Sequence, residues 1–323
     1  MNPETVQVNE ARMTEVIKRC LAAREKEKLI FRDRPRPPEE DYIQLLKSVG
    51  TSLGDNRFAL NALFLTTMLV RGDSTRNLFK RISDSYKLTR DSWIFRPKIV
   101  TTQDPDEVIA SCYQFFRPGS FSGQAIDKSW LYNCKLLHQR YNGDIRCFFE
   151  KHGFSAIKIV KALHYKARAK TEEKKKHHAF WGFGPKLALL YIQWVNQYLH
   201  PLEDADKIGP PVDFQLSRVF IQTGAVRLET PITAYELTNR ILHPSLTRLC
   251  EKHNWHPRMV SETIWEVGNL ACGRHAHTLC PVEDMCTSLI SYKPYDRDGV
   301  LDPTDTGRFA KPQLNFFRQL NSS

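Results

Sequence analysis

Apolar residues recur at intervals of three and four along most of the chain, which is the spacing of amphipathic helices. The clearest such segments are Phe58 to Leu69, Val108 to Phe116, Trp130 to Tyr141 and Ile157 to Tyr165. Start signals agree, because Asp104 offers an N-cap and a proline follows it at the first helical position. Alternating strand patterns are scarce, so the sequence predicts an all-α protein.

Three stretches interrupt the helical pattern and predict longer connections. Phe31 to Glu40 alternates Arg with Pro, His200 to Pro211 carries three prolines and an acidic stretch, and the tail from Tyr292 onward repeats Pro, Asp and Gly. We expect the first stretch to be an extended link. The tail is expected to be loosely ordered or to lie over the body of the protein.

The net charge of the chain indicates the class of partner that it would bind. The 323 residues include 47 Lys and Arg against 36 Asp and Glu, a formal net charge of +11. This balance favours a polyanionic partner, with nucleic acid ahead of an acidic membrane surface. No apolar run approaches the roughly 18 residues of a membrane-spanning helix, and Met1 to Glu10 lacks the pattern of a signal peptide. We therefore expect an intracellular protein without a membrane partner, cytoplasmic or nucleoid-associated, or nuclear in a eukaryote.

A glycine-rich turn joins two helical segments between Phe180 and Ala188. Gly182 and Gly184 are separated by Phe183, and Pro185 stands at the start of the second helix. Glycine permits a positive φ and a close approach of the backbone to a ligand, and the first turn of a helix presents amide groups to an anion. These four residues are therefore candidates for contact with phosphate. An ordinary tight turn between two helices is the alternative.

Lys186 follows this turn, where a cation opposes the helix dipole by roughly 0.3 to 1 kcal/mol. Two roles would explain such a placement: contact with a phosphate, or use as a nucleophilic amine. The third interpretation is an exposed lysine that has neither role. The basic run from Lys174 to His178, just upstream, is simplest as a solvated loop.

Asp213 stands just before another amphipathic segment, in the sequence Pro211-Val212-Asp213. An aspartate at this point is an N-cap candidate whatever else it does. A catalytic role is the second interpretation.

Taken together, G-F-G-P-K-x-A followed by P-V-D-x-x-x-x-R-V resembles the helix-hairpin-helix and Gly/Pro-Asp signature of the endonuclease III superfamily of DNA glycosylases. The resemblance runs from about Asn56 to Cys286, and upstream it includes Gly123, Asn133 and the Tyr141-Asn142-Gly143 turn. Phe180-Trp181 stands where the family has Leu-Pro, so the choice of target base is not transferred.

The resemblance implies an architecture and an activity. It implies two helical domains, one over 50–200 that ends in the hairpin and one formed by 1–49 with 201–292, followed by a tail at 293–323, with the site in the cleft between the domains. The expected partner is double-stranded DNA with a damaged or modified base that is flipped out of the duplex, and the protein is expected to be a monomer. Asp213 would support departure of the base, and Lys186 would attack the sugar and give an associated AP lyase activity. Two alternatives are a DNA-binding relative that does not cleave and an N-glycosidase acting on a free modified nucleoside.

Three cysteines late in the chain are candidate metal ligands. Cys280 and Cys286 have the five-residue spacing of the last two ligands in the family's iron-sulfur loop, and Cys272 precedes them. His277 stands where a second cysteine is expected, with His275 as its alternative and Cys250 as a remote one. The resemblance implies a 4Fe-4S cluster of structural role, and Cys3His is also a normal zinc set.

Overall fold

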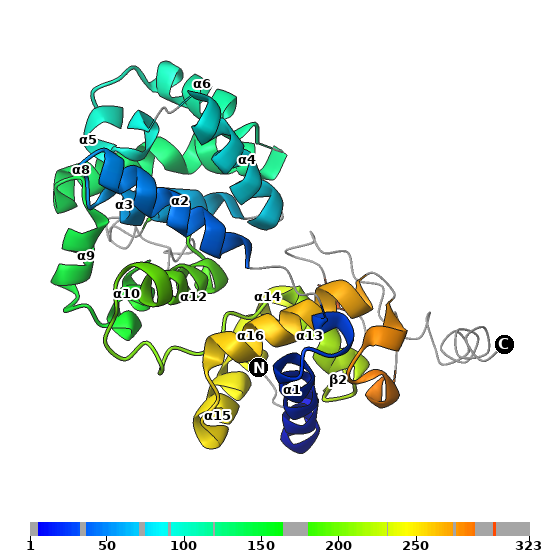
Figure 1. Cartoon of the computed structure of the whole chain (residues 1–323). Helices are drawn as coiled ribbons and strands as arrows, with labels where there is room; N and C mark the ends of the chain where they lie inside the picture. Colours follow the sequence, from blue (N-terminus) through cyan, green and yellow to red (C-terminus); the bar gives the residue numbers. More distant parts are fainter. Residues whose placement is uncertain are drawn as a thin grey trace. The chain divides into compact units, whose positions relative to one another are not determined.

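The computed structural model describes residues 6–32, 37–70, 75–89, 92–118, 120–163, 180–230, 232–273, 276–287 and 300–301. Helices dominate these residues, which confirms the predicted all-α class (Figure 1). The chain forms two compact units, one of residues 36–208 and one of residues 1–35 with 209–323. Each unit has a hydrophobic core of its own.

The unit of residues 36–208 is a helical bundle. Its helices are α2 (Pro38–Ser52), α3 (Phe58–Thr67), α4 (Thr75–Thr89), α5 (Pro97–Val100), α6 (Pro105–Phe116), α7 (Ser120–Ala125), α8 (Leu131–Tyr141), α9 (Ile145–Lys151), α10 (Ala156–Leu163) and α12 (Pro185–Trp194). Short 3-10 turns at Met68–Val70 and Trp93–Phe95 and π-helical turns at Ile126–Trp130 and Val195–Leu199 extend or join them.

Helix α3 lies at the centre of this bundle. All ten of its residues are buried, and α2, α9 and α12 pack against it (Figure 1). Its polar residue Asn61 is satisfied internally, because the side-chain amide donates to the Gly143 carbonyl at 2.9 Å and accepts from the Ile145 amide at 2.9 Å. Asn61 thereby fixes the turn between α8 and α9, within the segment that carries part of the family resemblance.

Helix α2 begins earlier than the sequence pattern predicts. Residues up to Glu40 were expected to form an extended link, whereas the helix begins at Pro38. Its first turn carries Glu39, Glu40 and Asp41. A proline at the first helical position and acidic residues in the first turn both favour a helix start. Helix α2 packs against α3 and α4, so residues 36–52 belong to this unit.

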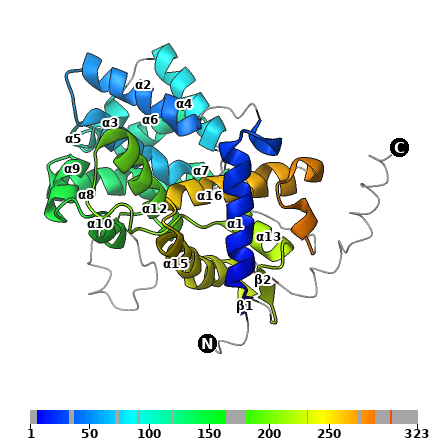
Figure 2. The ribbon, with the colours of Figure 1, turned by 60° about the horizontal axis from the view of Figure 1, so that its bottom comes forward.

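In its described residues, the unit of 1–35 and 209–323 is built on four longer helices, joined by short turns and strands. Its elements are β1 (Val6–Val8), α1 (Glu10–Glu25), η2 (Leu29–Phe31), α13 (Phe214–Gln222), β2 (Val226–Leu228), β3 (Ile232–Thr233), α14 (Ala234–Glu236), η7 (Leu237–Leu242), α15 (His243–His253), α16 (Pro257–Glu266), η8 (Val267–Cys272), η9 (His277–Leu279), η10 (Glu283–Met285) and β4 (Val300–Leu301). Strands β1 and β2 pair antiparallel with Val6 opposite Leu228 (Figure 2). Strand β4 pairs with β3, and the remainder of the predicted tail lies outside the described residues.

Helix α1 packs against α16 and crosses it, although some 240 residues separate them in sequence (Figure 2). Arg24 of α1 donates to Glu262 at 2.9 Å and to Thr263 at 2.8 Å, and Arg258 also pairs with Glu262. The side chains of Arg24 and Arg258 are only 11% and 7% exposed. Burial alone would raise the pKa of Glu262, but Arg258 and Arg24 outweigh it and hold this pKa below its usual value.

Glu262→Gln is expected to destabilise the protein by about 3 kcal/mol at neutral pH, because it leaves two buried guanidinium groups without their carboxylate. A carboxyl group whose folded pKa is lowered stabilises the fold above its unfolded pKa, and this contribution is lost as the pH falls through the folded value. The difference between wild type and variant should therefore narrow on acidification. Urea unfolding at pH 7 and near pH 4 measures both effects, and an equal difference at the two pH values would contradict the assignment.

None of the helices in the part of the chain that the structure describes is both long and apolar enough to cross a membrane.

Candidate functional site

The glycine turn before α12 is anchored by two buried phenylalanines. The Phe183 ring stacks on Phe64 of α3, with 5.0 Å between ring centroids and 11° between planes, and its edge meets Tyr191. Phe180 meets the edge of the same Phe64 ring at 4.7 Å and also contacts Phe148. Both phenylalanines are at most 1% exposed. The aromatic pair thus holds both ends of the turn in the core of the bundle.

Asn133 of α8 fixes the tip of the same turn. Its buried amide accepts from the Trp181 backbone amide at 2.8 Å and donates to the Trp181 carbonyl at 2.9 Å. The family resemblance includes Asn133 but implies no role for it. Its function here is positional, because the two hydrogen bonds hold the peptide groups on both sides of the Trp181 Cα atom.

The two glycines of the turn differ in what requires them. Gly182 has a φ of +90°, and a Cβ atom there would lie 2.9 Å from Cβ of Met68. Gly184 has an extended backbone, with φ −81° and ψ 177°, and a Cβ atom there would meet no described atom within 4 Å. Packing and backbone conformation therefore explain glycine at position 182. At position 184 the added atom would meet open space, and glycine there is explained by its place as the N-cap of α12, a position that favours glycine over alanine.

Lys186 lies in the first turn of α12, directly after this anchored segment. Gly184 is the N-cap residue, Pro185 occupies the first helical position, and Lys186 follows it, half-buried. The buried face of α12, which includes Leu187, Ala188 and Tyr191, holds the helix in the core. The structure thus brings Gly182, Phe183, Gly184, Pro185 and Lys186 together at one end of a rigid helix. The basic run from Lys174 to His178 lies outside the described residues.

Asp213 is the N-cap of α13, as expected of its place in the sequence. Its carboxylate accepts from the Gln215 amide at 2.9 Å, and the residue is 8% exposed. The preceding backbone is held by two side chains, because Ser261 donates to the Pro211 carbonyl at 2.7 Å and His243 Nδ1 donates to the Pro210 carbonyl at 3.0 Å. Asp213 is therefore a fixed carboxylate. It belongs to the unit of residues 209–323, whereas Lys186 belongs to the other unit.

The cysteine loop follows η8 and is closed by short turns. Cys272 and Cys280 are buried, Cys286 is half-buried, and all three are unpaired. His277 is also buried, and His275 lies outside the described residues. Burial, followed by the nearby Glu283 and Asp284, raises the pKa of Cys280 to about 11. Burial, followed by Cys280 and the same two acidic residues, raises the pKa of Cys286 to about 12. Within the described residues, no three His, Cys, Asp or Glu side chains are gathered into a group able to hold a metal ion.

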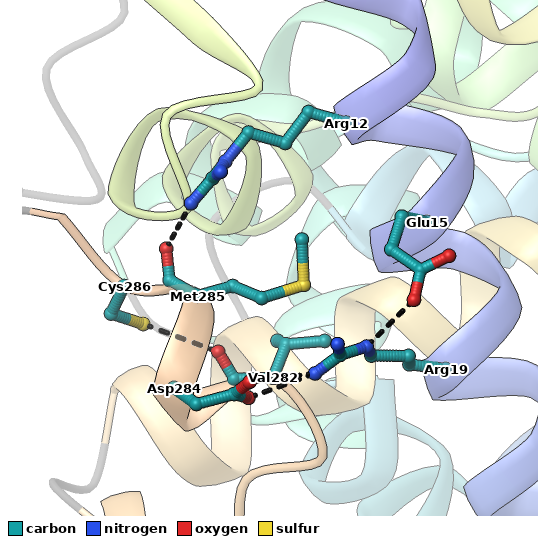
Figure 3. A network of polar contacts seen from close by, with 7 residues as sticks. All are labelled: Arg12, Glu15, Arg19, Val282, Asp284, Met285 and Cys286. Atoms are coloured by element: carbon teal, nitrogen blue, oxygen red, sulfur yellow. Dashed lines mark hydrogen bonds and ion pairs between the residues drawn. The ribbon is translucent and has the colours of Figure 1, made fainter.

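The loop is bound to α1, a contact that no pattern in the sequence predicts. Arg19 forms hydrogen bonds of 2.8 and 3.0 Å with the carboxylate of Asp284, and Arg12 donates to the Met285 carbonyl at 2.8 Å (Figure 3). Arg12 also donates to the Thr223 carbonyl at the end of α13. Helix α1 therefore contacts the segment that leads to Cys286.

Comparisons with protein families, with curated proteins and with solved structures found no match for this chain.

Proposed function

We propose that the protein is a DNA N-glycosylase that removes a damaged or modified base and then cleaves the resulting abasic site as a lyase. The observation that carries this proposal is the amine of Lys186 at the start of α12, directly after a glycine turn that is rigidly anchored yet open at Gly184. Catalytic groups must be held on rigid elements, and an open helix N-terminus is suited to a phosphate of the DNA backbone. The net charge of +11 and the resemblance to helix-hairpin-helix glycosylases support the same assignment.

The two proposed catalytic residues have different tasks. Departure of the base develops positive charge on the sugar, which a fixed carboxylate at Asp213 stabilises. Asp213 also accepts the proton that the attacking amine loses. Lys186 forms a bond to C1′ as the bond from C1′ to the base breaks, and the base leaves with that electron pair and takes up a proton. The bond from C1′ to the ring oxygen then opens, the oxygen takes up a proton, and the lysine nitrogen forms a Schiff base with C1′. Loss of a C2′ proton gives an enamine, whose electrons form the C2′–C3′ double bond as the C3′–O bond breaks and the 3′ phosphate leaves. Hydrolysis by water then frees Lys186.

A structural metal at the cysteine loop belongs to the same proposal. Cys272, Cys280 and Cys286 are soft thiolate donors suited to a 4Fe-4S cluster or to zinc, and the sequence offers His277 as a fourth ligand. A cluster there would pin the loop to the body of its unit. Base excision requires no redox step, so no step of the reaction passes through it.

Gly184→Ala is expected to weaken binding to duplex DNA about tenfold while changing the free energy of unfolding by less than about 1 kcal/mol. The added methyl group meets no described atom of the protein but would stand where the phosphate approaches. Fluorescence anisotropy with a labelled abasic duplex at fixed salt measures the affinity.

Gly182→Ala is the matched control within the same turn. Its positive φ and its contact with Met68 predict a loss of stability of about 1 to 3 kcal/mol. Thermal unfolding separates this folding defect from a binding defect. Unchanged DNA affinity in Gly184→Ala would contradict a phosphate contact at this turn.

A binder without catalytic activity is the second candidate, and the capping role of Asp213 favours it because capping alone accounts for an aspartate there. Such a protein would bind lesion-containing duplexes with a steep dependence on salt and leave them intact. An N-glycosidase acting on free nucleosides would show almost no salt dependence.

A further inference from the structure

Two aromatic side chains lie at the surface beside the glycine turn. Tyr132 of α8 is 38% exposed, and Trp181 is half-buried, although the other two aromatic residues of the turn, Phe180 and Phe183, lie in the core. The ring centroids of Tyr132 and Trp181 are 6.4 Å apart, and the ring planes meet at 68°. The reaction proposed above gives neither ring a task.

The backbone on both sides of Trp181 is held in place. The Asn133 side chain accepts a hydrogen bond from the Trp181 amide at 2.8 Å and donates one to the Trp181 carbonyl at 2.9 Å. Asn133 is fully buried and directly follows Tyr132 on α8, so one helix carries the first ring and fixes the residue that carries the second. A residue that is already fixed loses little conformational freedom when it binds a ligand.

The arrangement of the two rings leaves flat surface for a ligand. Because their planes meet at 68°, the edge of one ring is directed at the face of the other. At least one face of each ring is therefore not covered by its partner. Aromatic faces at a nucleic-acid surface stack on nucleobases, and every base has a π-face that allows such stacking.

Helix α8 also has the charge that a nucleic acid requires. It contains no acidic residue, and its basic residues are Lys135, His138 and Arg140. Lys135 is exposed and follows Tyr132 by three residues, so the two side chains are neighbours on one face of the helix. Cations that contact phosphates and aromatic rings that contact bases are the two parts of a binding site for unpaired nucleic acid.

We propose that Trp181 and Tyr132 form a stacking site for an unpaired nucleobase, next to the turn that contacts the phosphate backbone. This inference rests on the proposed function, from which it takes the DNA contact at the turn. The occupant is an unpaired base because neighbouring bases cover the faces of a base inside an intact duplex, whereas flipping a nucleotide out of the stack uncovers them. Stacking therefore adds affinity only for DNA in which a base lies outside the duplex.

Binding to DNA with a single bulged base tests this site. Fluorescence anisotropy at fixed salt compares a labelled duplex that has one bulged adenine with the fully paired duplex of the same sequence. The wild type is expected to bind the bulged duplex about tenfold more tightly. Trp181→Leu keeps an apolar side chain but removes the flat ring, so it should lose this preference and keep its affinity for the paired duplex. Trp181→Phe keeps a flat ring and should retain most of the preference.

Two further variants separate stacking from other effects. Trp265→Leu is the matched control, because Trp265 is 39% exposed on α16 of the other unit, and it should keep the full preference. Gly184→Ala alters the proposed phosphate contact, so it should weaken binding to both duplexes equally and leave their ratio unchanged. Thermal unfolding checks that Trp181→Leu remains folded, with a Tm lowered by no more than about 5 °C.

Several results would overturn the proposal. Equal affinity of the wild type for the two duplexes, or an unchanged preference in Trp181→Leu, would remove the stacking site and leave the glycosylase proposal in place. Loss of the preference in Trp265→Leu would show that it does not arise beside the glycine turn. A wild type that binds neither duplex would end both proposals. A wild type that shows the expected preference but releases no base from any lesion would retain the stacking site and end the glycosylase proposal.

A measurement on the wild type guards against a variant that fails to fold. When 5-iodouracil at the bulged position is irradiated, it loses iodine and becomes bonded to an aromatic side chain that is stacked on it. Mass spectrometry of the digested complex is expected to find this bond at Trp181 or Tyr132. A bond found only at other residues would contradict the assignment.

Discussion

Lys186→Ala should abolish trapping of the protein on a duplex with an abasic site in the presence of borohydride. The hydride reduces the Schiff base between the lysine amine and C1′ to a stable amine, and a chain without that amine cannot form it. We expect the yield of trapped complex to fall by about a hundredfold or more. Denaturing gel electrophoresis of a labelled duplex measures this yield.

Stability provides the first control for this variant. A cation in the first turn opposes the helix dipole, so removing it should leave the free energy of unfolding unchanged or raise it by a few tenths of a kcal/mol. Lys186→Arg keeps the charge but has no nucleophilic amine at neutral pH, so it should bind DNA normally and still fail to be trapped. Lys161→Ala, an exposed lysine on α10, should be trapped like wild type.

Two outcomes would contradict the assignment in different ways. Full trapping of Lys186→Ala would show that another amine is the nucleophile. A wild type that releases a base but is never trapped would be a glycosylase that uses water, in which case Lys186 serves the phosphate contact.

The helices were predictable where one face is apolar and the start is capped. Helix α6 begins after Asp104, whose carboxylate accepts from the amides of Asp106 and Glu107, as its sequence suggests. The start of α2 was predicted too late because its Arg-Pro context suggested an extended link up to Glu40, although Pro38 and the acidic first turn are start signals. Local sequence signals are therefore present at the start of both helices. The start of α2 was predicted too late because proline also favours an extended segment.

Local sequence patterns do not predict contacts between residues that are far apart in the chain. The spacing of Cys280 and Cys286 indicates a ligand loop, but no spacing rule connects this loop with α1. The contacts of Arg12 and Arg19 with Met285 and Asp284 show that α1 lies beside it. The same holds for Asn133. A polar residue within an apolar helix face predicts a buried hydrogen-bond partner but does not identify it. Its partner, Trp181, lies 48 residues away.

Asp213→Asn should reduce base excision by about a hundred- to a thousandfold while leaving the fold intact. The asparagine side-chain oxygen can still accept from the Gln215 amide, and Asn caps helices as well as Asp does, so the free energy of unfolding should change by less than about 0.5 kcal/mol. What is lost is the negative charge that stabilises the developing positive charge on the sugar. Single-turnover release of the base from duplexes with single lesions measures the rate.

Asp213→Ala separates the capping role of this side chain from its charge. It removes the cap as well, and should cost about 1 kcal/mol of stability in addition to the same loss of rate. If Asp213 only caps α13, Asp213→Asn would retain wild-type activity and Asp213→Ala would lose stability alone. The two variants therefore decide whether Asp213 acts through its charge or only through its hydrogen bond, whereas a wild type that releases no base would favour the binding protein.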